Sequence, residues 1–564
     1  MRSRKQKSSG PFVLGIDFGT LSARALIVNA ETGEEVASAA CDYPHGSIEE
    51  RLPGSKRPLP PDFALQHPAD WMHALFNIVP KAVKMSGVRP EQVVGIGTDF
   101  TSCTPLPTTR DGFPLCLDDR WSKDPHAWPK LWKHHAAQAQ ADRINQAGQE
   151  RSEAFIPAYG GRYSSEWMFS KVLETLENAP RVYAAADRFI EGGDWIVWQL
   201  TGNETRNLSA AGFKAMWVYP DGHGGWRYPD KAFFRALHPG LENVVEEKLG
   251  PTPVALGTSA GGLLPGMAER LGLCAGIPVA VGNIDAHVAV PACGVTRPGE
   301  MVMILGTSAC HLLVGNQQQL VKGMCGVVQN GVVNGAWGYE AGQASVGDLF
   351  AWYVRNGVPA WLQSSAKVAR SSPYELLEKQ AAELKPGQTG LLALDWWNGC
   401  RSVLMNSELS GLLLGVTLAT KPQEIYRALM ESTAFGTRRI LEAFTSQGVE
   451  IRRLAGCGGL AKKNPLLMQI YSDVLGLPIQ AASSDQACAL GAAMHGALAA
   501  GIFPNMQAAA SAMARMEPGS WKPHKPSKAT YDKLYAEYLR LHDHFGAGES
   551  GVMKTLRQLR AQSL

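Results

Sequence analysis

Two distant parts of the chain share one pattern of apolar and polar positions. An apolar run at 12–18 ends in a Gly-Thr turn, and a second run follows at 23–28. Far downstream, a run at 301–305 ends in a Gly-Thr-Ser turn, and a run at 310–314 follows. Two short apolar runs joined by a glycine-containing turn are typical of a β-hairpin. The pattern therefore predicts two hairpins in two similar halves of the protein.

Short apolar runs and stretches of helical period alternate along the rest of the chain. Runs of three to eight apolar residues beside glycine are typical of buried strands, and a repeat of 3.6 residues is typical of helices. This alternation predicts an α/β protein. The expected strands lie at 93–97, 279–282 and 454–459, and the expected helices at 136–147, 166–176, 425–444 and 464–475.

The stretch 425–444 is the clearest of the expected helices. Its apolar and small residues recur at helical spacing, which predicts one buried face and polar side chains on the others. The buried face would hold Ile425, Ala428, Leu429, Gly436, Ile440 and Ala443, with Arg427, Glu431 and Arg438 elsewhere.

A break in the pattern at 294–300 suggests a domain boundary. Thr296, Arg297, Pro298 and Gly299 interrupt the alternation there, and such residues mark loops. The expected organisation is a disordered basic tail at 1–10, an N-terminal domain at 11–295, a C-terminal domain at 296–505 and a helical extension at 506–564.

Composition and charge exclude several classes of protein. The chain has 564 residues, with 19% charged and 45% hydrophobic, which excludes a disordered chain. The net charge is +3, and the first ten residues carry four basic and no acidic side chains. The remainder is therefore close to neutral, and we expect no nucleic-acid partner. Glycine makes up 59 residues, a surplus that favours close backbone approach to a ligand.

Neither membrane association nor secretion is expected from the sequence. The longest apolar stretch, 490–503, is too short to span a bilayer and predicts a packed helix. The ten cysteines are scattered without a C-x-x-C pair, as in proteins of a reducing compartment. The basic tail is not followed by an apolar segment, so it does not form a signal peptide. These features predict a cytoplasmic protein.

Three glycine turns that follow apolar runs are candidate phosphate-binding loops. They are 15–20 (GIDFGT), 306–308 (GTS) and 456–459 (GCGG), and none matches the P-loop or dinucleotide-binding motif. Backbone N–H groups and short hydroxyls at such turns can hold phosphate oxygens. Asp17 lies at the end of its run, where its carboxylate can hold Mg²⁺ through water.

The order of these turns resembles the FGGY carbohydrate kinases, which belong to the actin, Hsp70 and sugar kinase superfamily. The resemblance runs from about residue 12 to 500 and includes the closing helix at 489–493. It implies two α/β, ribonuclease H-like domains with a cleft between them, and ATP and Mg²⁺ as cofactors. It also implies that Asp17 supports the metal. The implied nucleotide-binding residues are Gly19, Thr20, Ser22, Arg24, Gly306, Thr307, Ser308, Gly458, Gly459 and Asn464.

Asp285 in the segment Gly-Asn-Ile-Asp matches the family's catalytic base. A sugar hydroxyl is a weak nucleophile, and a carboxylate within hydrogen-bond reach can orient it and accept its proton. The alternative for Asp285 is a structural one, since aspartate also caps helices and a helix is expected from Ala286.

Five further stretches resemble the branch of the family that phosphorylates L-ribulose, a step of L-arabinose catabolism. They are 95–104, 163–167, 212–217, 339–343 and 395–401. This resemblance implies that the sugar is held by Ser102, Lys214, Asp285 and Glu340. Lys214 can donate to sugar oxygens and Glu340 can accept from hydroxyls. The alternatives are a surface lysine and a carboxylate at the start of a helix.

Other functions on the same scaffold stay open at this point. The substrate could be another pentulose or pentitol, such as xylulose or ribitol, and an actin- or Hsp70-like nucleotide switch would bind ATP without a sugar. A homodimer is expected. Among the 15 tryptophans, Trp132 and Trp167 are candidates for the pocket, whereas Trp195 and Trp352 are expected in the core. His134, His135, Asp124 and His126 lack a third metal ligand at suitable spacing and are interpreted as structural or surface residues.

Overall fold

The computed structural model describes residues 10–219, 225–548 and 550–562. Residues 1–9 of the expected basic tail lie outside the described residues. None of the helices in these ranges is both long enough and apolar enough to cross a membrane.

The first half of the chain forms a mixed sheet around the predicted N-terminal hairpin. Strand β1 pairs antiparallel with β2 and parallel with β4, and short β9 also pairs parallel with β4. The predicted strand at 93–97 is confirmed, but it continues to Phe100 and so includes Asp99. The strand order is β3 (Glu35–Asp42), β2 (Ser22–Asn29), β1 (Phe12–Phe18), β4 (Val93–Phe100), β8 (Pro278–Ala280) and β7 (Ser259–Gly262), with β9 (Asn283–Ile284) beside β4.

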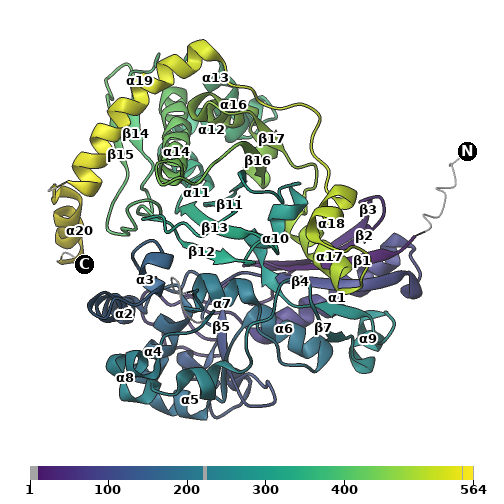
Figure 1. Ribbon diagram of the computed structural model, residues 1–564. Helices are drawn as coiled ribbons and strands as arrows, with labels where there is room; N and C mark the ends of the chain where they lie inside the picture. The colour runs from purple at the N-terminus through teal and green to yellow at the C-terminus, as the bar shows by residue number, and fades with distance from the viewer. Residues whose placement is uncertain (1–9, 220–224, 549, 563–564) are drawn as a thin grey trace, which may run out of the picture.

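The second half repeats this arrangement. Strand β10 pairs antiparallel with β11 and parallel with β16, as β1 does with β2 and β4. The prediction of two similar halves is confirmed, and Figure 1 shows the second sheet above the first. The strand order is β12 (Gly326–Gln329), β13 (Trp337–Gln343), β11 (Ala309–Gly315), β10 (Glu300–Leu305), β16 (Arg453–Cys457) and β17 (Ile479–Ala481).

Two small sheets and the helices surround these layers. The small sheets pair β5 (Pro105–Thr108) with β6 (Arg188–Glu191) and β14 (Leu392–Leu394) with β15 (Leu412–Leu414). Helices of the first half are α1 (Pro68–Ser86), α2 (Gln138–Glu150), α3 (Phe155–Ala158), α4 (Met168–Asn178), α5 (Pro180–Ala185), α6 (Gly192–Thr201), α7 (Leu208–Lys214), α8 (Lys231–Leu237), α9 (Pro265–Leu271) and α10 (Asp285–Ala292). Those of the second are α11 (Gly347–Asn356), α12 (Ala360–Val368), α13 (Pro373–Ala382), α14 (Pro422–Thr445), α15 (Gly459–Lys463), α16 (Pro465–Leu475), α17 (Ala487–Ala499), α18 (Met506–Met513), α19 (Lys525–His542) and α20 (Val552–Gln562).

Helix α17 joins the two halves by packing directly on the first sheet. It contacts β1, β4 and α10, and its central residues 489–497 are all buried, as expected for a packed helix at this position. The helix approaches the strands so closely that only glycine fits. A Cβ at Gly15 would lie 1.8 Å from Ala489 O, and one at Gly97 would lie 1.8 Å from Ala492 O. Figure 1 shows α10 and α17 together where the two sheets meet.

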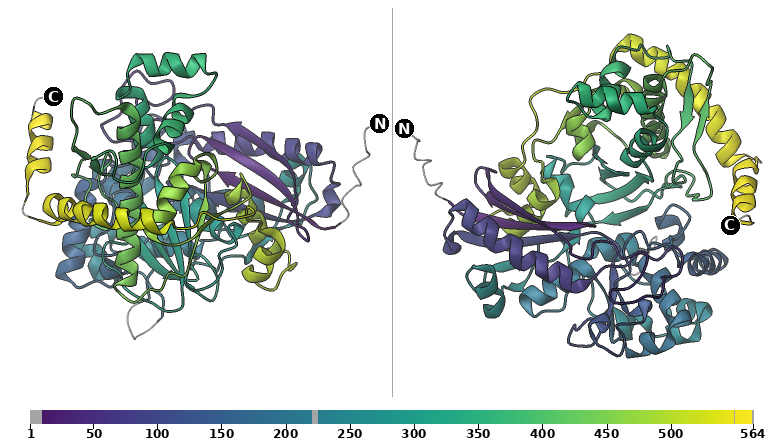
Figure 2. Two further views of the ribbon diagram at one scale, coloured as in Figure 1. Left: turned by 90° about the horizontal axis from the view of Figure 1, so that it is seen from above. Right: turned by 180° about the vertical axis from the view of Figure 1, so that it is seen from behind.

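Helix α14 confirms the predicted helix but not its polar faces. Arg427 and Glu431 are 4% and 2% exposed, so the expectation that they lie away from the packed face is wrong. Their side chains are 2.8 Å apart, and both bond to the hydroxyl of Tyr531 on α19. Helix α19 runs along the outer side of the second half (Figure 2). It covers a face of α14 that the sequence of α14 alone suggests is exposed.

The other sequence predictions differ from the structure in small ways. The helices expected at 136–147 and 166–176 are present as α2 and α4, each shifted toward the C-terminus. Trp195 is buried as expected, but Trp352 is 42% exposed, so its assignment to the core is wrong. Trp352 instead rests against the ring of Trp397.

Candidate active site

Two buried aspartates face one another at the ends of β1 and β4. Asp17 and Asp99 are register partners in these parallel strands, and they are 7% and 0% exposed. Arg24 on β2 places Nη1 3.2 Å from Asp17 Oδ2, but among the described residues no Arg, Lys, amide or hydroxyl donor bonds to either oxygen of Asp99. Burial raises the pKa of both carboxyls, and the charge of Asp17 raises the pKa of Asp99 further.

A third aspartate, Asp285, begins α10 directly after β9. Because Asn283 is the register partner of Asp99, the chain places Asp285 just past the first two aspartates. Its Oδ1 accepts a hydrogen bond from the N–H of Ala286 at 2.6 Å. Burial and the charge of Asp17 raise the pKa of Asp285 to about 7. The helix-cap alternative is wrong in detail, since Ile284 holds the N-cap position.

Lys214 and Glu340 form a buried ion pair between the two halves. Lys214 ends α7 and Glu340 lies on β13, and the lysine Nζ is 2.8 Å from each carboxylate oxygen. They are 6% and 9% exposed, so the surface alternative for Lys214 is wrong. The helix-start alternative for Glu340 is also wrong, because it lies within a strand. Trp167 covers the ammonium, with Nζ 5.4 Å from the ring centre.

His287 connects this ion pair to α10. Its Nε2 lies 3.1 Å from Glu340 Oε2, and its Nδ1 lies 2.7 Å from the hydroxyl of Ser209. Burial alone would raise the pKa of Glu340, but Lys214 and His287 lower it to about 2. Glu340 therefore stays ionised at neutral pH and can accept hydrogen bonds from a ligand.

Ser102 lies in the loop that follows β4. Its hydroxyl is buried and has no partner, and the same is true of Thr98 Oγ1 and of the Asp99 carboxylate. Buried polar atoms are rarely left unpaired in proteins. This concentration of unpaired atoms at one end of β4 is typical of a site that a ligand completes.

The first glycine turn is held by side chains from outside the hairpin. Gly19 N donates to Ser22 O at 3.0 Å, which closes the turn. Gln66 Nε2 donates to Thr20 O at 2.8 Å, and Trp132 Nε1 donates to Thr20 Oγ1 at 3.1 Å. Trp132, a candidate for the sugar pocket on sequence grounds, thus contacts the first glycine turn instead.

The second and third glycine turns lie against each other. Gly306 N donates to Ser308 O at 3.0 Å, and the backbone oxygen of Thr307 accepts from Val346 N at 2.9 Å. Gly458 has φ +90°, and a Cβ there would lie 2.5 Å from Leu305 O. Only glycine therefore lets β16 turn beside the end of β10.

Asn464 and Gly459 differ in what they leave free for a nucleotide. Asn464 caps α16, with Oδ1 accepting from Leu467 N at 2.8 Å, and it is 5% exposed. Its side-chain oxygen is thus already used. Gly459 has open space where a Cβ would lie, so a ligand can approach its backbone.

Cys488 at the start of α17 shows how close these groups are. Burial raises the pKa of its thiol, and the charges of Asp17, Asp99 and Asp285 raise it further. The three carboxylates from separate strand ends therefore lie close enough to the start of α17 to act on one thiol. The structure brings together Asp17, Asp285, Ser102 and the Lys214–Glu340 pair.

The donor set fits a magnesium ion held through water. Asp17 and Asp99 offer carboxylate oxygens, which Mg²⁺ prefers, and both Asp99 oxygens lack protein partners. A second group in the described residues, His45, His67 and Asp70, also has metal-ligand side chains close together. There, however, Asp70 accepts two hydrogen bonds from His45, and His67 caps α1.

Sequence reasoning missed Asp99, His287 and Gln66 as candidate site residues. The signal for Asp99 was present, because it ends a buried strand as Asp17 does. His287 lies two residues after Asp285, but its contact with Glu340 depends on how the halves meet. No local pattern marks Gln66, which reaches Thr20 across 46 positions of sequence.

Comparison with known families gives matches to both halves. Residues 12–291 match the N-terminal domain of the FGGY family of carbohydrate kinases, and residues 301–500 match its C-terminal domain. Together these matches cover most of the chain.

Individual relatives and solved structures agree with these matches. The chain is 52% identical to "Ribulokinase" of Shouchella clausii over 98% of each chain. It is 51% identical to "Ribulokinase" of Geobacillus thermodenitrificans, over 97% of this chain and 96% of the relative. In fold, it is similar to xylulose kinase from Rhodospirillum rubrum, with TM-score 0.76, 21% identity and coverage of 95% and 99%. It is also similar to gluconate kinase from Lactobacillus acidophilus, with TM-score 0.78, 16% identity and coverage of 96% and 99%.

Proposed function

The chain belongs to the FGGY family of carbohydrate kinases, and we propose that it transfers the terminal phosphoryl group of ATP to L-ribulose. The products are ADP and L-ribulose 5-phosphate, so the attacking group is the C5 hydroxyl of the sugar. The substrate is inferred from two ribulokinases that are about half identical over almost the whole chain. The structural observation that carries the proposal is Asp285, a half-buried carboxylate between the Asp17–Asp99 pair and the Lys214–Glu340 pair.

Asp285 acts as the general base. Its pKa of about 7 leaves a substantial unprotonated fraction at neutral pH, and that form accepts the proton of the C5 hydroxyl as its oxygen attacks phosphorus. The N–H of Ala286 fixes one carboxylate oxygen, so the other oxygen is free to accept the proton.

The Lys214–Glu340 pair and Ser102 hold the sugar. Lys214 donates to the keto oxygen or to a hydroxyl, and ionised Glu340 accepts from hydroxyls. The unpaired hydroxyl of Ser102 provides a further hydrogen bond. His287 keeps Glu340 oriented from the opposite side.

The glycine turns bind the nucleotide from both halves. Thr20 of the first turn, Arg24 of the adjoining strand β2 and Thr307 of the second turn face the phosphates, and the open backbone at Gly459 receives the adenosine. Asp17 and Asp99 would hold Mg²⁺, which neutralises phosphate charge when bound. Closure of the halves would exclude water from the transferred phosphoryl group.

The decisive experiment is a substrate panel with coupled detection of ADP. L-Ribulose, xylulose, ribitol and other pentuloses and pentitols are compared at equal enzyme concentration, together with ATP alone. We expect the highest kcat/KM with L-ribulose and little ADP release without sugar. Preference for xylulose or ribitol would replace the substrate but keep the kinase. Release of ADP at a rate that no sugar changes would instead identify a nucleotide switch.

The unpaired state of all ten cysteines supports a cytoplasmic location, because reducing compartments keep thiols free.

A further inference from the structure

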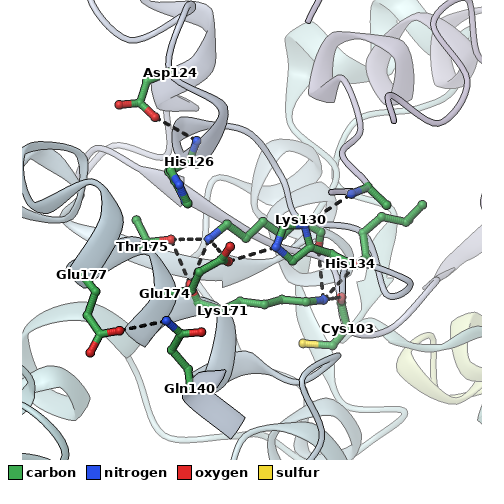
Figure 3. A network of polar contacts seen from close by, with 12 residues as sticks. Cys103, Asp124, His126, Lys130, His134, Gln140, Lys171, Glu174, Thr175 and Glu177 are labelled. Atoms are coloured by element: carbon green, nitrogen blue, oxygen red, sulfur yellow. Dashed lines mark hydrogen bonds and ion pairs between the residues drawn. The ribbon is translucent and has the colours of Figure 1, made fainter. Parts of the chain in front are cut away.

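A buried lysine on α4 binds three backbone carbonyls that belong to two separate segments. Lys171 is 1% exposed, and its Nζ donates to Cys103 O at 2.7 Å, Leu131 O at 2.9 Å and Lys130 O at 3.2 Å. Figure 3 shows this ammonium between the two segments. The three N–H donors of the ammonium thus have three acceptors.

Each of these segments carries a residue of the proposed site beside the carbonyl that Lys171 binds. Cys103 directly follows Ser102, whose hydroxyl is buried and unpaired. Leu131 directly precedes Trp132, whose indole N–H bonds to the hydroxyl of Thr20. Lys171 therefore fixes both the loop that meets the sugar and the support of the first phosphate turn.

Glu191 holds the same loop from its other side. Its Oε1 accepts from the Cys103 thiol at 2.7 Å, and its Oε2 accepts from Thr104 N at 2.8 Å. Glu191 is itself 6% exposed. The loop is thus clamped between a buried cation and a buried carboxylate, which leaves Ser102 little freedom to move. Glu191 has no contact of this kind with the Trp132 segment.

A neighbouring lysine provides an internal comparison. Lys130 is also buried, at 3% exposed, and its Nζ bonds to Glu174 Oε2, Thr175 Oγ1 and Lys171 O. Because Lys130 lies two residues before Trp132, its ammonium ties the Trp132 segment to α4, where His134 also meets Glu174, but all three of its bonds go to α4 and not to the Ser102 loop. The two lysines share burial and charge but differ in what they hold (Figure 3).

We propose that Lys171 is a positioning residue that fixes the sugar-binding loop and the first phosphate turn in position relative to each other. Acting through the carbonyls of Cys103 and Leu131, it fixes the distance between the sugar hydroxyl and the phosphoryl group that this hydroxyl receives. The proposal rests on the proposed function, which gives Ser102 and Thr20 their roles. A displacement of about 1 Å at a reacting group can cost about 10²-fold in rate.

The test measures KM for L-ribulose, KM for ATP and kcat in four single variants, with folding checked by circular dichroism and thermal unfolding. K171M keeps an unbranched side chain one atom shorter but removes the donors, and we expect both KM values to rise and kcat/KM to fall about 10- to 100-fold. The matched control K130M loses the same charge but leaves the bonds to the Ser102 loop in place, and we expect a lower Tm with KM for L-ribulose within about twofold of wild type.

Two further variants separate the two segments. E191Q changes only the loop side, and we expect KM for L-ribulose to rise while KM for ATP stays unchanged. W132F removes the indole N–H that bonds to Thr20, and we expect KM for ATP to rise while KM for L-ribulose stays unchanged. If K171M folds with unchanged KM values, or loses no more than K130M, the proposal is overturned.

If K171M does not fold, E191Q and W132F decide whether the proposal holds. Unchanged kinetics in both would mean that the segments Lys171 holds have no effect on substrate binding, which also overturns the proposal, whereas the separate KM effects support it. A wild-type enzyme that ignores L-ribulose would overturn the proposed function instead, and that result is visible before any variant is made.

Discussion

At the ends of their central strands, the two halves differ in the side chains of equivalent positions. In the first half, Asp17 of β1 pairs with Asp99 of β4 and with Arg24 of β2. In the second half, Ile304 of β10 occupies the position before its Gly-Thr turn that corresponds to Asp17. Its register partners are Cys457 of β16 and Cys310 of β11. One half thus carries three charged groups where the other carries an isoleucine and two thiols.

The difference shows what the shared strand order does and does not determine. In both halves it produces a glycine turn at the end of a buried strand, which is suited to bind phosphate. The charged side chains that we propose to handle the proton and the cation, Asp285, Asp17 and Asp99, lie in the first half. Burial of a carboxylate is unfavourable unless a ligand or proton neutralises it. A second copy of the acidic cluster would add that cost without adding a second reaction.

The largest effect is expected from replacing the base. In Asp285→Asn, the amide cannot accept the hydroxyl proton, so kcat should fall about 10²- to 10⁴-fold. The amide oxygen can still accept from Ala286 N, so the KM for ATP should change little. Steady-state kinetics with coupled ADP detection measures this change. A kcat close to that of wild type would show that another group takes the proton.

Replacing Asp17, the first-half counterpart of Ile304, should have the next largest effect. This variant tests the comparison of the two halves directly. Asp17→Asn removes one negative charge from the proposed magnesium site, and we expect activity to fall about 10- to 100-fold, with a higher Mg²⁺ concentration for half-maximal rate. The matched variant in the other half is Ile304→Val, for which we expect a change of less than about twofold. Equal losses in the two variants would mean that the halves do not divide the chemistry.

The fold was easier to predict from the sequence than the site. Both hairpins are formed by residues close in sequence, so apolar runs and a glycine turn were sufficient. The role of Asp285 came from resemblance, because its own segment also suits a helix cap. Asp99 was missed because its strand was expected to end at Gly97, and His287 because its partner Glu340 lies in the other half. The burial of Arg427 requires α19, which local periodicity cannot include.

The pH dependence of kcat/KM tests whether the surroundings of Asp285 in the first half raise the pKa of this carboxyl. Because the pKa of this carboxyl is raised to about 7, its basic form is lost as the pH falls through that value. We expect kcat/KM for L-ribulose to rise about tenfold per pH unit below pH 7 and to level off above it. Rates are measured from pH 5.5 to 8.5 with ATP and Mg²⁺ saturating. A kcat/KM that stays constant down to pH 5.5, as the ordinary aspartate pKa near 4 would give, would contradict the raised pKa.

The smallest expected effect concerns stability and compares Asp99 with its counterpart Cys457. Burial and Asp17 raise the pKa of Asp99 well above its ordinary value, whereas the unfolded chain ionises it near pH 4. Folding must therefore take up a proton above that pH, so the wild-type protein loses stability as the pH rises from about 4 toward the folded pKa. Asp99→Asn removes this loss, and without Mg²⁺ we expect its Tm at pH 7.5 to exceed that of wild type by about 1–3 °C, and the two to converge near pH 4. Cys457→Asp should have the opposite effect, because it buries a new carboxyl in the apolar half. If the Tm difference between Asp99→Asn and wild type does not change with pH, then the ionisation of Asp99 does not destabilise the folded protein.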